Sequence, residues 1–293
     1  MPELPEVETI ARGLASRVAG DVIDSIWLGS KPELLKSSAS EIANTVESKR
    51  IVGVRRVGKH IVFDLENGGP ASSAVKRKSS QKSSKPAGGG SRSTPDEAQW
   101  IVHLGMTGRM LVCEPDHAIE KHTHAIAKLA SGRELRFVDP RRFGRLSVAH
   151  GFDAPGAEPL EIDLDRFIEL FRGRKTPIKS ALLNQKLLRG VGNIYADESL
   201  FRAGIRPRRR AASLTRDELA RLYSAIREVL KEAIALGGST VSDYVDADGE
   251  QGFFQLQHRV YGRESEPCLV CKTPVKRIVI AGRSSHYCPT CQK

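Results

Sequence analysis

The spacing of apolar residues near the start of the chain predicts one helix. Val7, Ile10, Leu14 and Val18 recur at the interval that places side chains on one face of an α-helix. Gly20 follows the last of them, where helices commonly end. We therefore expect an amphipathic helix that begins close to the N-terminus and packs one face against a core.

The next part of the chain alternates apolar and polar residues in short runs rich in β-branched side chains. Close turns separate several of these runs, which favours antiparallel strands over helices. The predicted strands cover residues 22–28, 50–57, 60–65, 100–104, 108–112, 124–129, 134–138 and 144–148. A first domain made of one helix and a β-sandwich is therefore expected over residues 1–152.

A stretch rich in Pro and Gly, residues 153–159, precedes a change to helical periodicity. The predicted helices cover residues 164–171, 178–188, 194–203 and 215–236. The last forty or so residues read as short strands around cysteines. The prediction is thus an α+β protein with a helical second domain over 153–252 and a small third domain over 253–293.

Residues 67–98 differ in composition from their surroundings. They are rich in Gly, Ser, Lys and Pro and include three consecutive glycines. Such a segment buries too little apolar surface to offset the entropy of ordering it. We expect a disordered insertion within a hairpin, because strands resume after it.

The charge of the chain indicates nucleic acid as a partner. The net charge is +11, but residues 67–94 of the insertion contain six basic residues and no acidic one, and without them the chain carries +5. A local signal is stronger, since residues 251–293 contain seven Lys and Arg against two acidic residues. No apolar run reaches the roughly 18 residues of a membrane span, and no signal peptide opens the chain, so a cytoplasmic protein without a membrane segment is expected.

Four cysteines near the C-terminus have the spacing of a zinc site. Cys268 and Cys271 form one close pair, and sixteen residues later Cys288 and Cys291 form the second. Four thiolates in two close pairs bind one structural Zn²⁺ tetrahedrally, with no open position for catalysis. The residues between the pairs predict a hairpin that presents Arg283 as a clamp for phosphate.

The first six residues place an amine beside carboxylates. Removal of Met1 would leave Pro2 with a free secondary amine, and α-amino groups titrate near pH 7.7–8.0. An unprotonated amine can form a Schiff base, and Glu3 and Glu6 could move protons beside it. The same residues also suit the first turn of an ordinary helix, where proline and acidic side chains are favoured.

Four further stretches carry polar or aromatic residues at predicted turns, and each also has a plain structural interpretation. Residues 190–195 form a glycine turn before a helix whose amides could bind phosphate. Residues 139–144 contain two arginines and Phe143, which could wedge into a base stack. Residues 103–106 follow a strand, and Lys59 lies in a Gly-Lys turn between two strands.

Together these stretches resemble the formamidopyrimidine-DNA glycosylase family, the bacterial type of 8-oxoguanine DNA glycosylase. The resemblance covers nearly the whole chain except the insertion. Its motifs occur in order, at residues 2–9, 103–106, 139–144, 190–196 and 260–263 and at the four cysteines. It implies a helix-two-turn-helix second domain and a C-terminal zinc ribbon.

The resemblance implies a bifunctional enzyme that acts on damaged double-stranded DNA. Pro2 would attack C1′ of the damaged nucleotide and form an imine, while Glu3 would protonate the sugar ring oxygen. Elimination of both flanking phosphates would leave a one-nucleotide gap. Glu6 matches an acidic residue that lines the pocket, and the family implies a monomer with one structural zinc.

The resemblance also assigns residues that hold the DNA. Lys59 matches a phosphate-binding residue that is also linked to catalysis. The other phosphate-binding positions match His103, Asn193 and Arg283. Three residues match the set that fills the hole left by the flipped base, and these are Met106, Arg141 and Phe143, with Arg141 facing the orphaned cytosine.

Three other interpretations remain open at this stage. Endonuclease VIII, a sister family that acts on oxidised pyrimidines, shares the architecture, but it usually has Gly where this chain has Leu4. Residues 237–252 correspond to the variable loop over the damaged base, so lesion preference is the least determined inference. A non-catalytic protein that binds damaged DNA would keep the clamps without the chemistry, and a zinc-ribbon RNA-binding protein would have no use for the Pro-Glu start.

Overall fold

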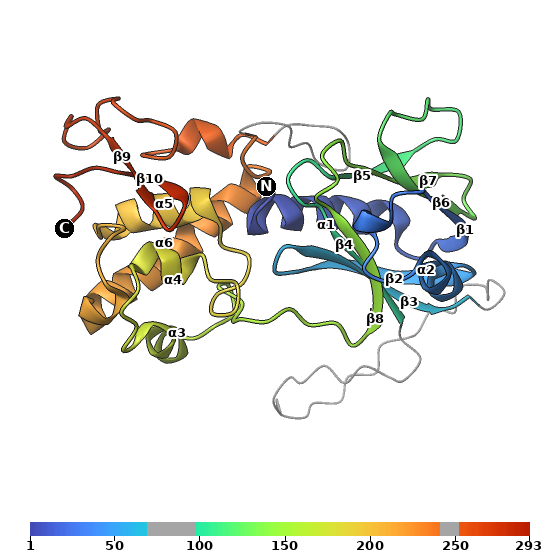
Figure 1. Cartoon of the computed structure of the whole chain (residues 1–293), viewed down its shortest axis with the longest axis horizontal. Helices are drawn as coiled ribbons and strands as arrows, with labels where there is room; N and C mark the ends of the chain where they lie inside the picture. Colours follow the sequence, from blue (N-terminus) through green and yellow to red (C-terminus); the bar gives the residue numbers. More distant parts are fainter. Residues whose placement is uncertain (69–97, 241–251) are drawn as a thin grey trace, which may run out of the picture.

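The computed structural model describes residues 1–68, 98–240 and 252–293 of the 293-residue chain (Figure 1). The predicted insertion, apart from its first and last residues, lies outside these ranges, and so does most of the loop predicted over 237–252. Two groups of elements stand side by side, one built on strands and one on helices (Figure 1). The α+β class predicted from the sequence is confirmed.

The N-terminal helix ends at Val18 as the apolar spacing predicts, but it begins three residues before the predicted start at Val7. Helix α1 spans Leu4–Val18, and Val7, Ile10 and Leu14 on its apolar face are buried. The chain turns away at Gly20, whose φ of +89° lies in the left-handed region that glycine adopts at little cost. The helix thus begins four residues from the N-terminus and holds that end of the chain in place.

The strand-rich half is one antiparallel sheet of eight strands in the order β5-β7-β6-β1-β2-β3-β4-β8. Its strands are β1 (Val22–Leu28), β2 (Lys49–Val57), β3 (His60–Asn67), β4 (Ala98–His103), β5 (Arg109–Cys113), β6 (Thr123–Leu129), β7 (Glu134–Val138) and β8 (Arg145–His150). Strands β1 and β2 pair through only two residue pairs, Val22 with Arg50 and Ile23 with Lys49. The sheet is therefore continuous but narrow at this seam, and side chains from both sides of it share one core.

A second helix in this half was not predicted. Helix α2 (Ala39–Val46) follows the short 3₁₀ helix η1 (Pro32–Leu34), and its first turn is capped because Ser38 Oγ accepts the N–H of Glu41 at 3.1 Å. Only Ile42 and Val46 of this helix are buried. Two buried residues give too short a periodic signal to distinguish a helix from a loop.

In the parts of the second half that the structure describes, four α-helices surround a separate core. They are α3 (Leu164–Phe171), α4 (Ile178–Leu182), α5 (Asn193–Ala203) and α6 (Arg216–Ala235), with the 3₁₀ helix η2 (Ala211–Ser213) before α6. The helix predicted over 178–188 is too long, because α4 ends at Leu182 and the chain then turns, with the N–H of Leu187 bonded to the carbonyl of Asn184 at 2.8 Å. Apolar residues beyond the turn continue the helical spacing, and for this reason the predicted helix extends too far.

The C-terminal part consists of η3 (Phe254–Gln257) and a two-stranded hairpin of β9 (Lys276–Ile280) and β10 (Arg283–Tyr287). Its small core joins two cysteines to Phe201 of α5. Strand β10 also contacts α5 directly. The hairpin therefore sits on the helical half rather than on the sheet.

The N-terminus lies at the junction of the two halves, as Figure 1 shows. Leu4 belongs to the helical core, whereas Val7, three residues further on, belongs to the core of the sheet. Helix α1 also contacts α6. Within the described ranges, no helix is long and apolar enough to cross a membrane.

Candidate active site at the N-terminus

The backbone fixes the N-terminal residues before any side chain acts. The N–H of Leu4 donates to the carbonyl of Gly190 at 3.0 Å, which ties the start of α1 to the turn before α5. Pro2 is buried, Glu3 is the N-cap of α1, and Pro5 lies in the first turn of the helix. The segment is thus a regular helix start, and its bond to Gly190 also holds its first residues against the helical half.

The carboxylate of Glu3 is inserted into the N-terminus of α5. Its Oε1 accepts the N–H of Ile194 at 3.1 Å and its Oε2 that of Tyr195 at 3.5 Å. Burial raises the pKa of Glu3, while the charge of Lys59 and these two amides oppose the rise. A carboxyl group with a raised pKa retains a proton nearer to neutral pH, which suits a general acid.

Glu6 connects three separate segments. Its Oε2 accepts the N–H of Glu3 at 2.8 Å, and its Oε1 accepts the N–H of Ser239 at 2.8 Å and the hydroxyl of Tyr195. Burial raises the pKa of Glu6, and the neighbouring charge of Glu3 raises it further. Glu6 therefore joins the N-terminus to the segment that leads into the loop after α6.

The α-amino group and the side chain of Lys59 act on each other electrostatically. Burial lowers the pKa of the amino group of Met1; Glu3 and Glu6 oppose this effect, while Lys59 and Arg141 add to it. Burial also lowers the pKa of Lys59, which is nearly buried in the turn between β2 and β3, and Arg283 lowers it further. A lowered pKa enlarges the unprotonated and nucleophilic fraction of an amine at neutral pH.

His103 carries a proton on one defined nitrogen. The N–H of Gly105 donates to His103 Nδ1 at 3.1 Å, so Nδ1 must be unprotonated and the neutral ring carries its hydrogen on Nε2. Burial, together with the nearby His60 and Lys59, lowers the pKa of His103 to about 4. At neutral pH the side chain is therefore an uncharged donor beside Lys59.

The three residues predicted to fill the base stack lie on two adjoining turns. Met106 and Phe143 are exposed, at 39% and 48%, although both are apolar. The guanidinium of Arg141 lies over the ring of Phe143 at 4.9 Å from its centre. Exposed apolar side chains next to a cation are the expected arrangement for a wedge that enters DNA.

One carboxylate fixes both of these turns. Asp139 Oδ1 accepts the hydroxyl of Thr107 at 2.6 Å, and its Oδ2 accepts the N–H of Gly144 at 2.7 Å. The turns also touch directly, because a Cβ on Gly105 would lie 2.5 Å from the nitrogen of Gly144. Buried Asp139 therefore sets the spacing between Met106 on one turn and Phe143 on the other.

The predicted phosphate-binding residues Asn193 and Arg283 lie at the contact between α5 and the hairpin. Asn193 is the first residue of α5, and its Nδ2 donates to Ser284 Oγ at 3.3 Å. Arg283 is the exposed first residue of β10. The sequence places these residues 90 positions apart, whereas the fold brings Asn193 into contact with Ser284, the residue after Arg283.

The four cysteines form a compact cluster of their own on the C-terminal part. Their Sγ atoms all lie within 4.8 Å of one another, with separations of 3.9 Å between Cys268 and Cys291 and 3.4 Å between Cys271 and Cys288. Zinc–sulfur bonds of about 2.3 Å in a tetrahedron place sulfurs about 3.8 Å apart. The cysteines therefore fit one Zn²⁺, which would stabilise the ribbon and take no part in reactions at Glu3.

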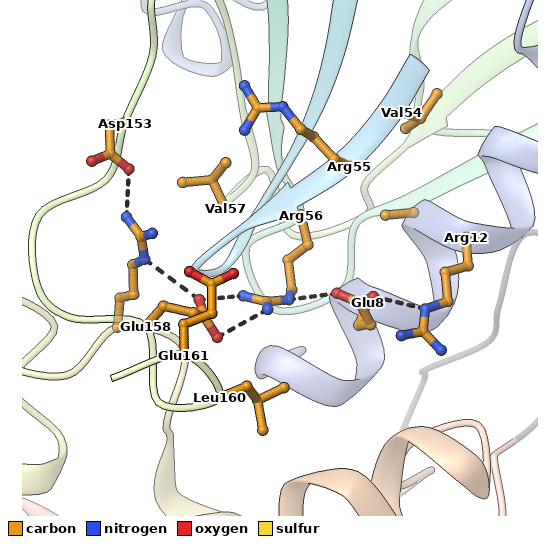
Figure 2. Close-up of a pocket in the computed structure, with 12 residues that line it drawn as sticks. Glu8, Arg12, Val54, Arg55, Arg56, Val57, Asp153, Glu158, Leu160 and Glu161 are labelled. Atoms are coloured by element: carbon orange, nitrogen blue, oxygen red, sulfur yellow. Dashed lines mark hydrogen bonds and ion pairs between the residues drawn. The ribbon is translucent and has the colours of Figure 1, made fainter. Parts of the chain in front are cut away.

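A charged network crosses between the two halves beside a pocket of about 640 Å³ (Figure 2). Arg56 of β2 makes two bonds with Glu158, at 2.9 and 3.0 Å, and one with Glu8 of α1 at 2.8 Å. Arg189 reaches the same Glu158 at 3.4 Å. Figure 2 shows Arg56 between Glu158 and Glu8. Because Glu158 also pairs with Arg189, it joins the sheet to the segment that leads to Gly190.

Several residues of this site were not predicted from the sequence. They are Tyr195, Ser239, Arg56, Glu158, Lys179 and Asp197. The sequence carries one signal, since Asp197 and Glu198 lie within an otherwise largely apolar run, residues 194–201. In the structure all eight of these residues are buried. Acidic side chains are rarely buried without partners, so they mark a helix that holds other segments.

Comparison with known families gives matches along most of the chain. Residues 1–146 match the formamidopyrimidine-DNA glycosylase N-terminal domain, and residues 154–245 match the formamidopyrimidine-DNA glycosylase H2TH domain. Residues 265–293 match the zinc finger found in FPG and IleRS. Three consecutive family matches thus follow the order of the sheet, the helices and the cysteine hairpin.

Individual relatives agree over their full lengths. The formamidopyrimidine-DNA glycosylase of Solibacter usitatus is 42% identical, with 100% of both chains covered. The crystal structure of MutM (FPG) from Thermus thermophilus is 40% identical, covers 99% of this chain and 98% of its own, and has a TM-score of 0.81. A Lactococcus lactis FPG mutant in complex with Fapy-dG DNA is 31% identical with a TM-score of 0.84, and both chains are covered completely. This chain belongs to the formamidopyrimidine-DNA glycosylase family.

Proposed function

We propose that this protein excises oxidised purines from duplex DNA and then cleaves the strand, with the amine of Pro2 as nucleophile. The observation that carries the proposal is the position of Glu3, a buried carboxyl group with a raised pKa, directly beside the N-terminus. Relatives of similar fold have been crystallised with Fapy-dG DNA and with abasic-site DNA. Those complexes support damaged DNA as the partner of this chain.

The first step is displacement of the damaged base. After removal of Met1, the nitrogen of Pro2 attacks C1′ and the glycosidic bond breaks. The base leaves with its bonding electrons and takes up the proton that the amine loses. Proton transfer from Glu3 to the ring oxygen opens the sugar and leaves an iminium between Pro2 and C1′. The same burial that lowers the pKa of the Met1 amino group raises the pKa of Glu3, and Pro2, itself buried, would present its amine in these surroundings.

The second step is elimination. Loss of a proton from C2′ breaks the C3′–O3′ bond, and a further elimination breaks the C5′–O5′ bond, which leaves a one-nucleotide gap. Hydrolysis then returns the free amine. Lys59 is nearly buried beside Glu3, and its charge both holds the nearby phosphate and lowers the pKa of the amino group.

The remaining site residues hold bent DNA. His103, Asn193 and Arg283 would bind phosphates on either side of the lesion. Met106, Arg141 and Phe143 would fill the space of the extruded nucleotide, whose unstacking costs a few kcal/mol. Zn²⁺ bound to the four cysteines would keep the hairpin that carries Arg283 folded, and we expect the protein to act as a monomer in the bacterial cytoplasm.

Borohydride trapping tests the nucleophile. Wild-type protein incubated with a duplex containing 8-oxoguanine opposite cytosine should give a covalent adduct that mass spectrometry maps to Pro2. Pro2→Gly should lose most of this adduct and retain its circular dichroism spectrum. A protein of the same sequence with an acetylated N-terminus is the matched control, and full trapping by either protein would reject Pro2 as the nucleophile.

A duplex with thymine glycol separates the two substrate classes. Faster excision of 8-oxoguanine than of thymine glycol supports the purine preference, and the reverse order would assign the chain to pyrimidine lesions. Tight binding to both duplexes without strand scission or adduct would instead show a binding protein without catalysis.

A further inference from the structure

Lys179 and Asp197 form an ion pair that is completely buried. Lys179 Nζ lies 2.6 Å from Asp197 Oδ1, and neither side chain is exposed to solvent. Removing two charges from water costs several kcal/mol for each ion, and only excellent geometry with further hydrogen bonds recovers that cost. Neither residue belongs to the motifs that carry the resemblance, so the pair needs an explanation of its own.

The additional bonds of the pair all lead to one strand. Lys179 of α4 donates to the carbonyl of Ser284 at 2.6 Å, and Asp197 Oδ2 of α5 accepts the N–H of His286 at 2.8 Å. Ser284 also receives the bond from Asn193. Three side chains from two helices thus hold the backbone and side chains of β10 directly after Arg283.

Stability alone is a weak reason for such a pair. Replacing a buried ion pair with apolar residues of similar size is often neutral or stabilising. What apolar residues cannot reproduce is a directed bond to a particular carbonyl, which fixes where the strand lies along the two helices. These bonds reach the strand one and three residues after Arg283, which indicates that the position of Arg283 is what they set.

We propose that Lys179 and Asp197 are a positioning pair for the phosphate clamp formed by Arg283 and Asn193. The inference rests on the proposed function, because it assumes that Arg283 binds a DNA phosphate. Being fully buried, Lys179 itself cannot touch the DNA. It acts by holding the carbonyl of Ser284, which fixes the backbone next to Arg283. The exposed side chain of Arg283 then loses less conformational entropy when it binds a phosphate.

The test uses Lys179→Met, which is close in size and removes the charge. Binding to a duplex with a stable abasic analogue is measured over a range of salt concentrations. Loss of one phosphate contact lowers the slope of log K against log salt by about one, and it weakens binding about tenfold at moderate salt. We expect both changes for Lys179→Met and for Arg283→Ala, and no further change in the double variant.

Arg136→Met is the matched control. Arg136 and Glu134 form another nearly buried pair, at 2.7 Å, but in strand β7 and away from the hairpin. Its loss should lower the melting temperature and leave affinity and salt slope unchanged. If Lys179→Met does not fold, as judged by circular dichroism, the apolar pair Lys179→Met with Asp197→Leu replaces it in the same cycle.

Two results would overturn the proposal. An unchanged salt slope in a folded variant would show that Arg283 does not depend on the pair. The same conclusion would follow if the losses of affinity caused by Lys179→Met and Arg283→Ala were additive in the double variant. The proposed function is judged separately, by strand scission and adduct formation in the wild type. Scission with an unchanged slope rejects only the positioning role, and a changed slope without scission rejects only the chemistry.

Discussion

Gly192 and Glu3 are so close that no side chain fits between them. A Cβ on Gly192 would lie 2.2 Å from Glu3 Cδ and 2.4 Å from Oε1. The contact joins the turn before α5 to the carboxyl group at the start of α1, although 189 residues separate the two in sequence. The glycine in this turn is therefore required by the carboxylate it faces.

Gly192→Ala should displace the carboxylate of Glu3 and slow base excision. A displacement of about 1 Å at a reacting group can cost about a hundredfold in rate. The measurement is single-turnover excision of 8-oxoguanine with excess enzyme, so that weaker binding does not contribute. Gly53→Ala is the control, because a Cβ there meets nothing within 4 Å and its rate should be unchanged. Equal rates for wild type and Gly192→Ala would contradict the assigned role of this contact.

Glu3→Gln should change the dependence of stability on pH. Burial raises the pKa of Glu3 above its ordinary 4.5, so the folded protein binds the proton more tightly than the unfolded chain does. Stability from this group is then fully present below pH 4.5 and is lost as pH rises through the folded pKa. Melting temperatures from pH 4 to 8 should fall less steeply in the variant, and at pH 7 it should be more stable than wild type.

The same variant should lose catalysis while it gains stability. Removal of a general acid typically costs about a hundredfold to ten-thousandfold in rate. Glu264→Gln, at an exposed position, is the control for the loss of one negative charge. A Glu3→Gln protein that is less stable than wild type at pH 7 would show that the carboxylate is held charged in the folded state.

Removal of zinc should weaken DNA binding more than the chemistry. The cysteine cluster supports the hairpin that carries Arg283, whereas Glu3 and Lys59 lie in another part of the fold. Chelation should reduce affinity for an abasic duplex, and Cys288→Ser should show the same loss without chelator. Excision at saturating enzyme should remain within a few-fold of wild type. A protein depleted of zinc that binds DNA normally would contradict this division of roles.

Arg56→Met should destabilise the contact between the two halves. It leaves Glu8 and Glu158 without their shared partner, and breaking a buried pair costs about 3–5 kcal/mol. Urea unfolding measures the change. Arg216→Met is the control, since its pair with Asp165 is exposed on both sides and should contribute less than about 1 kcal/mol. Similar losses in the two variants would mean that burial of the network contributes nothing.

Periodicity was sufficient for the elements that bury one regular face. Helix α1 and the strands from β1 to β8 follow the predicted runs because alternation or helical spacing persists over several residues. Periodicity failed at α2, because only two residues of that helix are buried. It also failed after α4, where apolar residues continue the helical spacing beyond the end of the helix. The pattern of apolar residues does not indicate the turn at Asn184, because that turn depends on backbone hydrogen bonds.

The candidate residues of the site were identified by motif, but their partners were not. Nothing near Glu3 in the sequence indicates that the amides of Ile194 and Tyr195 hold its carboxylate. Likewise the bonds from Lys179 and Asp197 to β10 join segments about 90 to 105 residues apart. Such contacts follow from how the halves dock, which no single stretch of sequence specifies.

The hydrogen bond between Leu4 and Gly190 has a consequence for truncated forms of the protein. Glu3 is encoded at one end of the gene, yet the amides of Ile194 and Tyr195 that hold its carboxylate belong to the other half of the protein. A truncated N-terminal product would therefore carry Glu3 without the groups that fix its position. The arrangement around Glu3 forms only once both halves have been synthesised and have assembled.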